Sequence, residues 1–265
     1  MVQQSGNLAT KDKLQARDYD PANDVMPLPT LRPSFALCVQ RIVDHMNEHM
    51  KGARLPSILD IGCGRRSDLG KYLRENHYQA TLHGADLDTN AQKNEDLDRL
   101  FLCDVADMPF QDGSYDIVFS QFLLEHVEDS QRAISSIARV TASGGLATLI
   151  IPNPTAPAAW ITKLTPYSFH VFFKRRIQGF YNASADTFPT TFDFKTIKTL
   201  QQQMSDAGFT AIAIDYVPEI YYRFRLRPGL IHLAMAYTKV LQWLNLEVLM
   251  SSVVVSGIKA SPTDS

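Results

Sequence analysis

Cysteine, net charge and long apolar runs are all scarce in this chain. Three of its 265 residues are cysteines, at positions 38, 63 and 103, and they form no C-x-x-C pair. This spacing predicts neither a disulfide framework nor a zinc knuckle, and it favours a reducing compartment. The formal net charge of −2 provides no general basic field that would hold nucleic acid, so we expect no nucleic-acid partner.

The chain also lacks sequence features that would direct it into a membrane or to secretion. No uninterrupted run reaches about 18 apolar residues, so no membrane-spanning helix is expected. The first 20 residues are polar and contain no apolar signal-peptide core. We therefore expect a cytoplasmic protein.

What the sequence does contain is a regular alternation of short apolar strands and amphipathic helices. This alternation predicts an α/β fold with a doubly wound, mostly parallel sheet of seven strands and helices on both faces. The expected strands are 57–62, 81–87, 101–105, 115–121, 146–152, 209–217 and 249–260, and the expected helices are 33–51, 68–76, 89–99, 129–142 and 194–207.

The domain organisation predicted from this pattern is simple. Residues 1–32 form an irregular N-terminal segment, and residues 33–265 form one domain with two inserted caps, at about 153–193 and 218–246. The first cap is rich in aromatic residues, which suit a pocket for a flat or apolar acceptor but could equally form a small core of their own.

Basic clusters occur in both inserted segments. Lys174, Arg175 and Arg176 lie in the first, and arginines at 223, 225 and 227 precede an apolar helix near 229–246 in the second. Such clusters beside an apolar helix leave contact with a membrane surface open. The alternative is solvated surface and a helix that packs on its own protein.

Polar residues stand at the ends of four expected strands. Because the carboxyl ends of parallel strands meet at one edge of the sheet, these side chains should lie close together. The glycines at 62 and 64 let the backbone approach a ligand closely, and the following helix, capped by Ser67, offers N–H groups to an anion. Asp86 can accept from two ribose hydroxyls, while Asp104 can accept from an adenine amino group with Val105 against the ring.

The segments that carry these residues resemble the class I S-adenosylmethionine-dependent methyltransferases, and most closely a small-molecule group related to the ubiquinone and menaquinone methyltransferases. The segments are ILDIGCG (58–64), GADLD (84–88), LCDVADMPFQDGSYDIVFSQFLLEHVED (102–129) and ARVTASGGLATLIIPNP (138–154). The resemblance implies a Rossmann-like sheet and S-adenosylmethionine as cofactor. A dinucleotide fits less well, because its fingerprint needs a glycine at Ser67 and because Asp60 would repel a pyrophosphate.

The resemblance also implies a role for each matching position. The methionine part of the cofactor is expected at the first strand end, the ribose at the second, the adenine at the third, and the fourth flanks the cofactor. Asp60, Gly62 and Gly64 match the positions that bind the methionine part, and Asp86 and Leu87 those at the ribose. Asp104 and Val105 match the positions at the adenine, and Ser120 and Gln121 those that flank the cofactor. Many members have a third glycine two positions after Gly64, where this chain has Arg66.

The expected activity is methyl transfer to a small acceptor that is aromatic or lipid-like. A general base would be needed for some acceptors, and His126 is the first candidate, ahead of His170 and Glu125; packing or helix capping is the alternative role of His126. A protein of this fold that binds the cofactor without catalysis remains the alternative function. The oligomeric state stays open.

A second motif points elsewhere and is not adopted. Residues 45–49, HMNEH, match the H-x-x-E-H pattern of one metallopeptidase group. The match is five residues long and leaves the four strand-end segments unexplained, so no metal site is expected.

Overall fold

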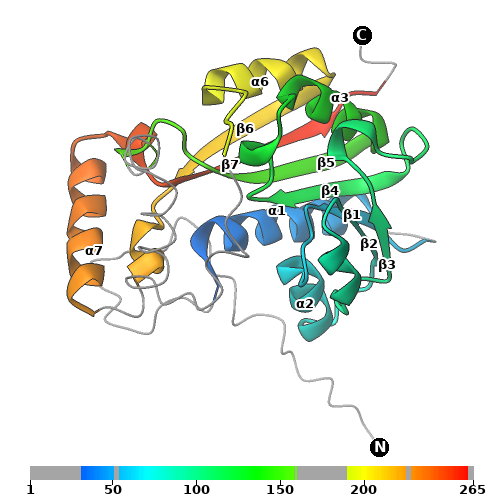
Figure 1. Ribbon diagram of the computed structural model, residues 1–265, viewed down its shortest axis with the longest axis horizontal. Helices are drawn as coiled ribbons and strands as arrows, with labels where there is room; N and C mark the ends of the chain where they lie inside the picture. Colours follow the sequence, from blue (N-terminus) through cyan, green and yellow to red (C-terminus); the bar gives the residue numbers. More distant parts are fainter. Residues whose placement is uncertain (1–30, 51–53, 158, 160–189, 225–227, 262–265) are drawn as a thin grey trace, which may run out of the picture.

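The computed structural model describes residues 31–50, 54–157, 159, 190–224 and 228–261. Its seven strands form one sheet in the order β3-β2-β1-β4-β5-β7-β6 (Figure 1). Strand β7 is antiparallel to both of its neighbours, and the other pairs are parallel. The predicted fold class is confirmed. The strands are β1 (Ser57–Ile61), β2 (Thr81–Asp86), β3 (Arg99–Leu102), β4 (Tyr115–Gln121), β5 (Thr141–Pro152), β6 (Phe209–Val217) and β7 (Ser252–Lys259).

Helices cover both faces of the sheet. One face carries α3 (Ser130–Val140) and α6 (Ile197–Asp206), and the other carries α1 (Pro33–His49) and α2 (Asp68–Glu75) (Figure 1). Strand side chains alternate between the two cores: Leu59 and Ile61 pack under α3, and Ile58 packs under α1. The apolar residues on the buried face of α1 are Phe35, Cys38, Val39 and Ile42, at the i, i+3, i+4, i+7 spacing of an amphipathic helix.

The prediction of a helix at 89–99 is wrong. The structure has a short 3₁₀ helix, η1 (Thr89–Lys93), followed by an irregular segment that leads to β3. The reason lies in Asn94, whose Nδ2 donates to the carbonyl of Gly64 (3.0 Å) and whose Oδ1 accepts from the Asp96 N–H (3.0 Å). These side-chain bonds replace the helical ones, and β3 begins at Arg99, two residues earlier than expected.

Two other boundaries differ from the prediction. The strand expected from residue 146 begins earlier, at Thr141, where β5 pairs with Tyr115 of β4. The irregular register that follows this pair absorbs Gly144, whose φ is 75°. The last strand begins at Ser252, after a 3₁₀ turn, η5 (Glu247–Leu249).

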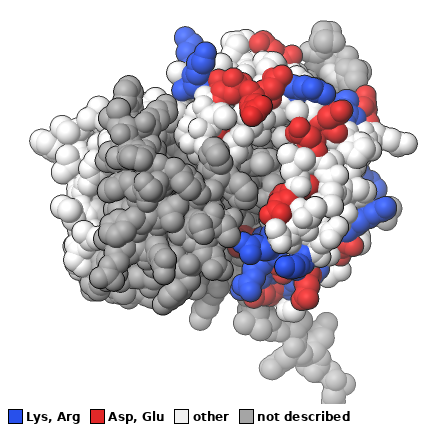
Figure 2. All heavy atoms as spheres, viewed as in Figure 1, with Lys and Arg blue, Asp and Glu red and all other residues white. Residues whose placement is uncertain are grey.

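Helix α7 (Pro228–Trp243) stands apart from the two helical layers, at the left of Figure 1. It packs on η4 (Ile220–Phe224) through a third core of Tyr221, Ile231 and Ala234. Among the described helices, none is long and apolar enough to cross a membrane. Figure 2 shows acidic and basic side chains mixed over the sheet side of the molecule, whereas the described atoms at the α7 margin are white.

Most of the first inserted segment lies outside the described residues. This applies to 160–189, and with it to the basic cluster at 174–176 and to His170. The N-terminal segment is described from residue 31 onward. The predicted domain boundaries therefore stay predictions.

Candidate active site

The carboxyl ends of β1, β2 and β4 lie side by side, as the alternating pattern requires. Ile61 pairs with Ala85 on one side and with Ser120 on the other. The loop after β1 is anchored by the Gly62 N–H, which donates to the carbonyl of Ala85 at 2.8 Å. The predicted polar strand ends therefore share one edge of the sheet.

Both glycines of this loop have left-handed backbone conformations, with φ of 71° at Gly62 and 56° at Gly64. A Cβ at Gly62 would lie 3.0 Å from the side chain of Leu123, a tight contact, so both the space and the backbone conformation favour glycine there. A Cβ at Gly64 would meet nothing within 4 Å. The loop is thus packed closely against Leu123 at Gly62, whereas it has free space beside Gly64.

Asp86 fixes the shape of this loop. Its Oδ2 accepts from the Gly64 N–H and its Oδ1 from the Asp88 N–H, both at 2.8 Å. A carboxylate offers about four lone-pair sites, so it can still accept from two hydroxyls. The positioning of Gly64 by Asp86 was not predicted from the sequence. The neighbouring Leu87 is 70% exposed, which leaves an apolar side chain open at this strand end.

Asp60 lies beneath the loop and is buried. It accepts a hydrogen bond from the Ser67 hydroxyl, whose oxygen accepts in turn from the Gly70 N–H and so caps α2. Burial raises the pKa of Asp60 to about 7, although the Ser67 bond opposes this shift and the charges of Asp68 and Asp86 reinforce it. A carboxyl with this pKa is ionised more fully when a cation arrives beside it.

The remaining predicted cofactor residues have different surroundings. Asp104 is exposed and caps the 3₁₀ helix η2 (Val105–Asp107) by accepting from the Ala106 N–H at 2.9 Å, while Val105 is buried. Gln121 reaches Asp68 across a long contact of 3.4 Å. Ser120 is 2% exposed, and among the described residues its hydroxyl has no hydrogen-bond partner. A buried hydroxyl without a partner at this strand end is typical of a site where a bound polar ligand forms the missing hydrogen bond.

His126 lies on η3 (Leu124–His126), in the loop after β4. Its side chain is 26% exposed, and Nε2 lies 3.8 Å from Oε1 of the buried Glu125. The Glu125 carbonyl accepts from the Thr191 N–H (2.7 Å), and the Thr191 hydroxyl donates to the Val127 carbonyl (2.8 Å). The chain that returns from the first inserted segment is thus fastened to the loop that carries His126.

A buried carboxylate that the sequence did not single out lies at this edge. Glu219 accepts from the Ser34 hydroxyl (2.6 Å) and N–H (3.2 Å) and from the Ser252 hydroxyl (2.6 Å). It ties the start of α1 and the start of β7 to the chain beyond β6. Its partners are 185 and 33 positions away, so no local pattern could have revealed it.

An arginine at the same place was also missed. The Arg32 guanidinium lies over the Phe122 ring, 4.8 Å from its centroid, and over the Tyr222 ring at 5.3 Å. Phe122 directly follows β4 and has a φ of 56°, a conformation that is strained for an aromatic residue. These contacts place the end of the N-terminal segment beside the strand end that carries Ser120.

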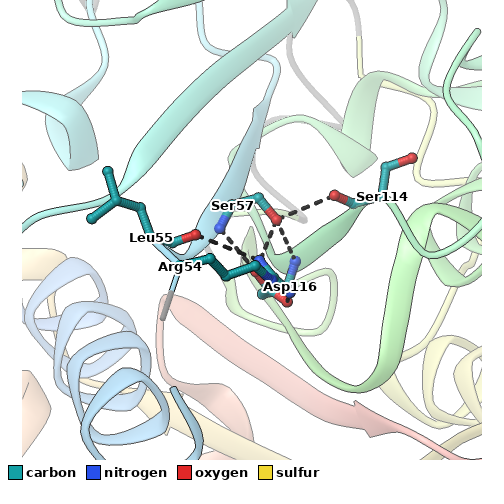
Figure 3. A network of polar contacts seen from close by, with 5 residues as sticks. All are labelled: Arg54, Leu55, Ser57, Ser114 and Asp116. Atoms are coloured by element: carbon teal, nitrogen blue, oxygen red, sulfur yellow. Dashed lines mark hydrogen bonds and ion pairs between the residues drawn. The ribbon is translucent and has the colours of Figure 1, made fainter. Parts of the chain in front are cut away.

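The opposite edge of the sheet holds a different polar network (Figure 3). Asp116 accepts from both terminal nitrogens of Arg54, at 2.5 and 2.6 Å, and from the N–H and hydroxyl of Ser57, each at 2.9 Å. Burial alone would raise the pKa of Asp116, but the bonds from Arg54 and Ser57 outweigh it and lower the pKa. Because this network joins the starts of β1 and β4, it is structural.

The histidines of the H-x-x-E-H string lie away from the candidate site. His45 and His49 are ring neighbours on α1, with centroids 4.8 Å apart. Within the described ranges, no group of three His, Cys, Asp or Glu side chains is arranged to hold a metal ion.

Comparison with known proteins agrees with this geometry. A family model described as a methyltransferase domain matches residues 59–149. An O-methyltransferase of Aspergillus nomiae is 24% identical over 143 residues, covering 48% of this chain and 63% of that protein. A probable chloroplastic tocopherol O-methyltransferase of Oryza sativa subsp. japonica is 33% identical over 98 residues, covering 33% of this chain and 26% of that protein. The chain thus matches less than two thirds of the length of these curated relatives.

The fold likeness extends further than the sequence likeness. The structure of a SAM-dependent methyltransferase from Archaeoglobus fulgidus matches with a TM-score of 0.54, over 86% of this chain and 95% of that chain, at 16% identity. At this identity, the match shows the shared fold. The glycine loop and the acidic strand ends therefore lie within the part of the chain that is similar to a methyltransferase domain, and the chain shares its fold with a SAM-dependent methyltransferase.

Proposed function

We propose that this protein transfers the methyl group of S-adenosylmethionine to a small acceptor that is aromatic or lipid-like. The observation that carries the proposal is that Asp60 and Asp86 both hold the glycine loop at one edge of the sheet, with the buried Ser120 hydroxyl left without a partner among the described residues. The cofactor would supply a methyl carbon already activated by its sulfonium. The protein's own task is then to align the acceptor and exclude water.

Each strand end would hold one part of the cofactor. Asp60 and the Gly62–Gly64 loop would receive the methionine end, Asp86 the ribose hydroxyls, and Asp104 the adenine amino group. Leu87 and Val105 would contact the adenosine, and Ser120 and Gln121 would flank it. The raised pKa of Asp60 supports its place, because the ammonium of the methionine end would stabilise the ionised carboxylate.

The acceptor would enter beside the loop after β4. His126 is the proposed general base for an oxygen or nitrogen acceptor, since its imidazole is partly exposed and lies beside the Glu125 carboxylate, which would stabilise an imidazolium. The tocopherol O-methyltransferase among the relatives acts, by its name, on a phenol with an apolar chain, which supports an aromatic or lipid-like class. A relation to quinone methyltransferases is part of the same proposal.

The first test is calorimetric binding of S-adenosylhomocysteine to wild type, to Asp86→Ala and to a control, Asp107→Ala. The control removes an 82% exposed carboxylate. Charge-assisted hydrogen bonds contribute roughly 1.5–3 kcal/mol each, so Asp86→Ala should weaken binding at least about tenfold while the control binds like wild type. If wild type does not bind, the proposal fails.

Catalysis needs a separate assay. Transfer of labelled methyl groups to phenolic, quinol and lipid acceptors would support the enzyme, and loss of transfer with intact cofactor binding in His126→Ala would support the base. Tight cofactor binding without transfer to any acceptor class would favour the alternative, a non-catalytic protein of the same fold.

A further inference from the structure

The turn that carries His126 is bonded to one distant residue on both sides of this histidine. The Glu125 carbonyl accepts from the Thr191 N–H at 2.7 Å, and the Val127 carbonyl accepts from the Thr191 hydroxyl at 2.8 Å. The same hydroxyl oxygen lies 3.3 Å from the Glu125 carbonyl. The residues before and after His126 are thus both held by Thr191, which lies 64 positions beyond Val127.

The same turn has a second anchor, at the glycine loop. The Leu123 side chain packs closely against Gly62. The Leu123 carbonyl accepts from the His126 N–H at 2.9 Å. A displacement at either anchor, the glycine loop or Thr191, would therefore move the main chain that carries the imidazole.

The residues that follow Thr191 are firmly packed. Phe192 and Phe194 are buried, and their rings pack edge to face with centroids 5.8 Å apart. Asp193 accepts from the N–H and the hydroxyl of Ser130, at 2.9 and 2.8 Å, at the start of α3. Because these contacts join the neighbours of Thr191 to the helical layer, they give Thr191 a fixed place in the fold.

The backbone beside Thr191 is strained. Phe192 and Lys195 have φ of 48° and 54°, in the left-handed region that residues with a side chain rarely adopt. Strain of this kind persists only where the surrounding contacts impose it, and it is common at functional sites. Thr191 itself is exposed, so its neighbours and not its own burial fix its position.

We propose that Thr191 is a positioning residue for methyl transfer, which fixes the orientation of the His126 imidazole toward the acceptor. The inference rests on the proposed function. In that function, His126 takes the proton of an O–H or N–H acceptor as this oxygen or nitrogen bonds to the methyl carbon and the sulfonium becomes a thioether. The Thr191 hydroxyl touches none of the reacting atoms. An alignment error of about 1 Å can cost about a hundredfold in rate, so a loosened turn at His126 should lower kcat while cofactor affinity is kept.

The kinetic test compares Thr191→Val, which removes the hydroxyl but keeps the branched shape, with Thr191→Ser, which keeps the hydroxyl. Thr210→Val is the matched control, because this exposed residue donates to the Ile258 carbonyl (3.3 Å) at the opposite edge of the sheet. With a phenol, quinol or lipid that wild type methylates, Thr191→Val should lower kcat about tenfold. S-adenosylhomocysteine affinity should stay unchanged, and Thr191→Ser should retain most of the rate. In a His126→Ala background, Thr191→Val should have no further effect, because the two residues act as a unit.

The position of His126 can also be observed without any acceptor. The chain has seven histidines, and the imidazole signal that disappears from a proton–carbon correlation spectrum in His126→Ala identifies His126. This signal should shift in Thr191→Val and keep its place in Thr191→Ser and Thr210→Val.

Three results would overturn the proposal: an unmoved His126 signal in Thr191→Val, an equal loss of rate in Thr191→Ser, or additive losses from Thr191→Val and His126→Ala. Loss of S-adenosylhomocysteine binding in Thr191→Val would also overturn it, because the substitution would then disturb the whole cofactor edge. If wild type binds the cofactor but methylates no acceptor, the proposed function fails on its own, and the His126 signal still decides whether Thr191 holds this side chain.

Discussion

The neighbouring strands β1 and β4 each contain one buried carboxylate, Asp60 near the end of β1 and Asp116 near the start of β4. The two carboxylates have different hydrogen-bond partners, and folding shifts their pKa values in opposite directions. Asp116, where β4 begins, receives bonds from Arg54 and Ser57, and its pKa is lowered. Asp60, near the end of β1, receives a bond from Ser67, and its pKa rises to about 7. They are similarly buried, at 7% and 3% exposed. Partners rather than burial therefore decide whether a buried carboxylate stabilises the sheet or remains available to a ligand.

Substituting the two glycines of the loop after β1 should give the largest loss of unfolding free energy. Gly62→Ala combines a left-handed backbone with a Cβ 3.0 Å from Leu123, and should cost about 3 kcal/mol of unfolding free energy. Gly64→Ala has the backbone strain without the contact, and should cost about 1 kcal/mol. Urea unfolding of both variants measures the difference. Equal losses would contradict the packing argument.

Asp116→Asn tests the opposite edge. Removing the charge weakens four hydrogen bonds of a buried group, so we expect a loss of about 2 kcal/mol in unfolding free energy and unchanged S-adenosylhomocysteine affinity. Since the pKa of Asp116 is lowered by folding, its contribution to stability is present above the ordinary carboxyl pKa of 3.8 and is lost as pH falls through the folded value. The variant should lack this acid-dependent part.

Arg54→Met is the matched control for that substitution. The Arg54 side chain is 71% exposed, so its loss should cost less than about 1 kcal/mol. A loss as large as that of Asp116→Asn would mean that the ion pair, and not the Ser57 bonds, holds the strand starts together.

The raised pKa of Asp60 predicts how stability and cofactor binding depend on pH. Because its folded pKa is about 7, wild type should lose stability as pH rises from about 4 to 7. Cofactor binding through the ionised carboxylate should show the reverse trend, with up to about tenfold lower S-adenosylhomocysteine affinity at pH 6 than at pH 7. Calorimetry at several pH values, with Asp60→Asn as the control that should lack both trends, measures this. Parallel pH profiles for the two proteins would remove Asp60 from the site.

Local patterns were enough to predict the fold class and the shared edge of the site. The β-branched strands and the Ser67 cap depend on neighbours in sequence, and parallel strands necessarily bring Asp60, Asp86 and Ser120 to one edge. The roles of these residues toward the cofactor stay predictions.

The errors and omissions have a common cause. The helix expected at 89–99 failed because Asn94 bonds to the glycine loop 30 positions earlier. Glu219 and Arg32 were missed because their partners come from distant segments. Long-range side-chain bonds leave no period in the sequence, so periodicity cannot report them.

The place of β7 has a consequence for how the chain is made. It is the last strand in chain order, yet it lies between β5 and β6 in the described sheet, and Val253, Val254 and Val255 are fully buried. While the ribosome still holds this segment, β5 presents an open apolar edge and β6 has no neighbour to pair with. Open edges of this kind recruit other chains. Completion of the sheet is therefore a late event in synthesis, and a nascent chain halted before Ser252 would be prone to aggregate even though the cofactor loop has already been translated.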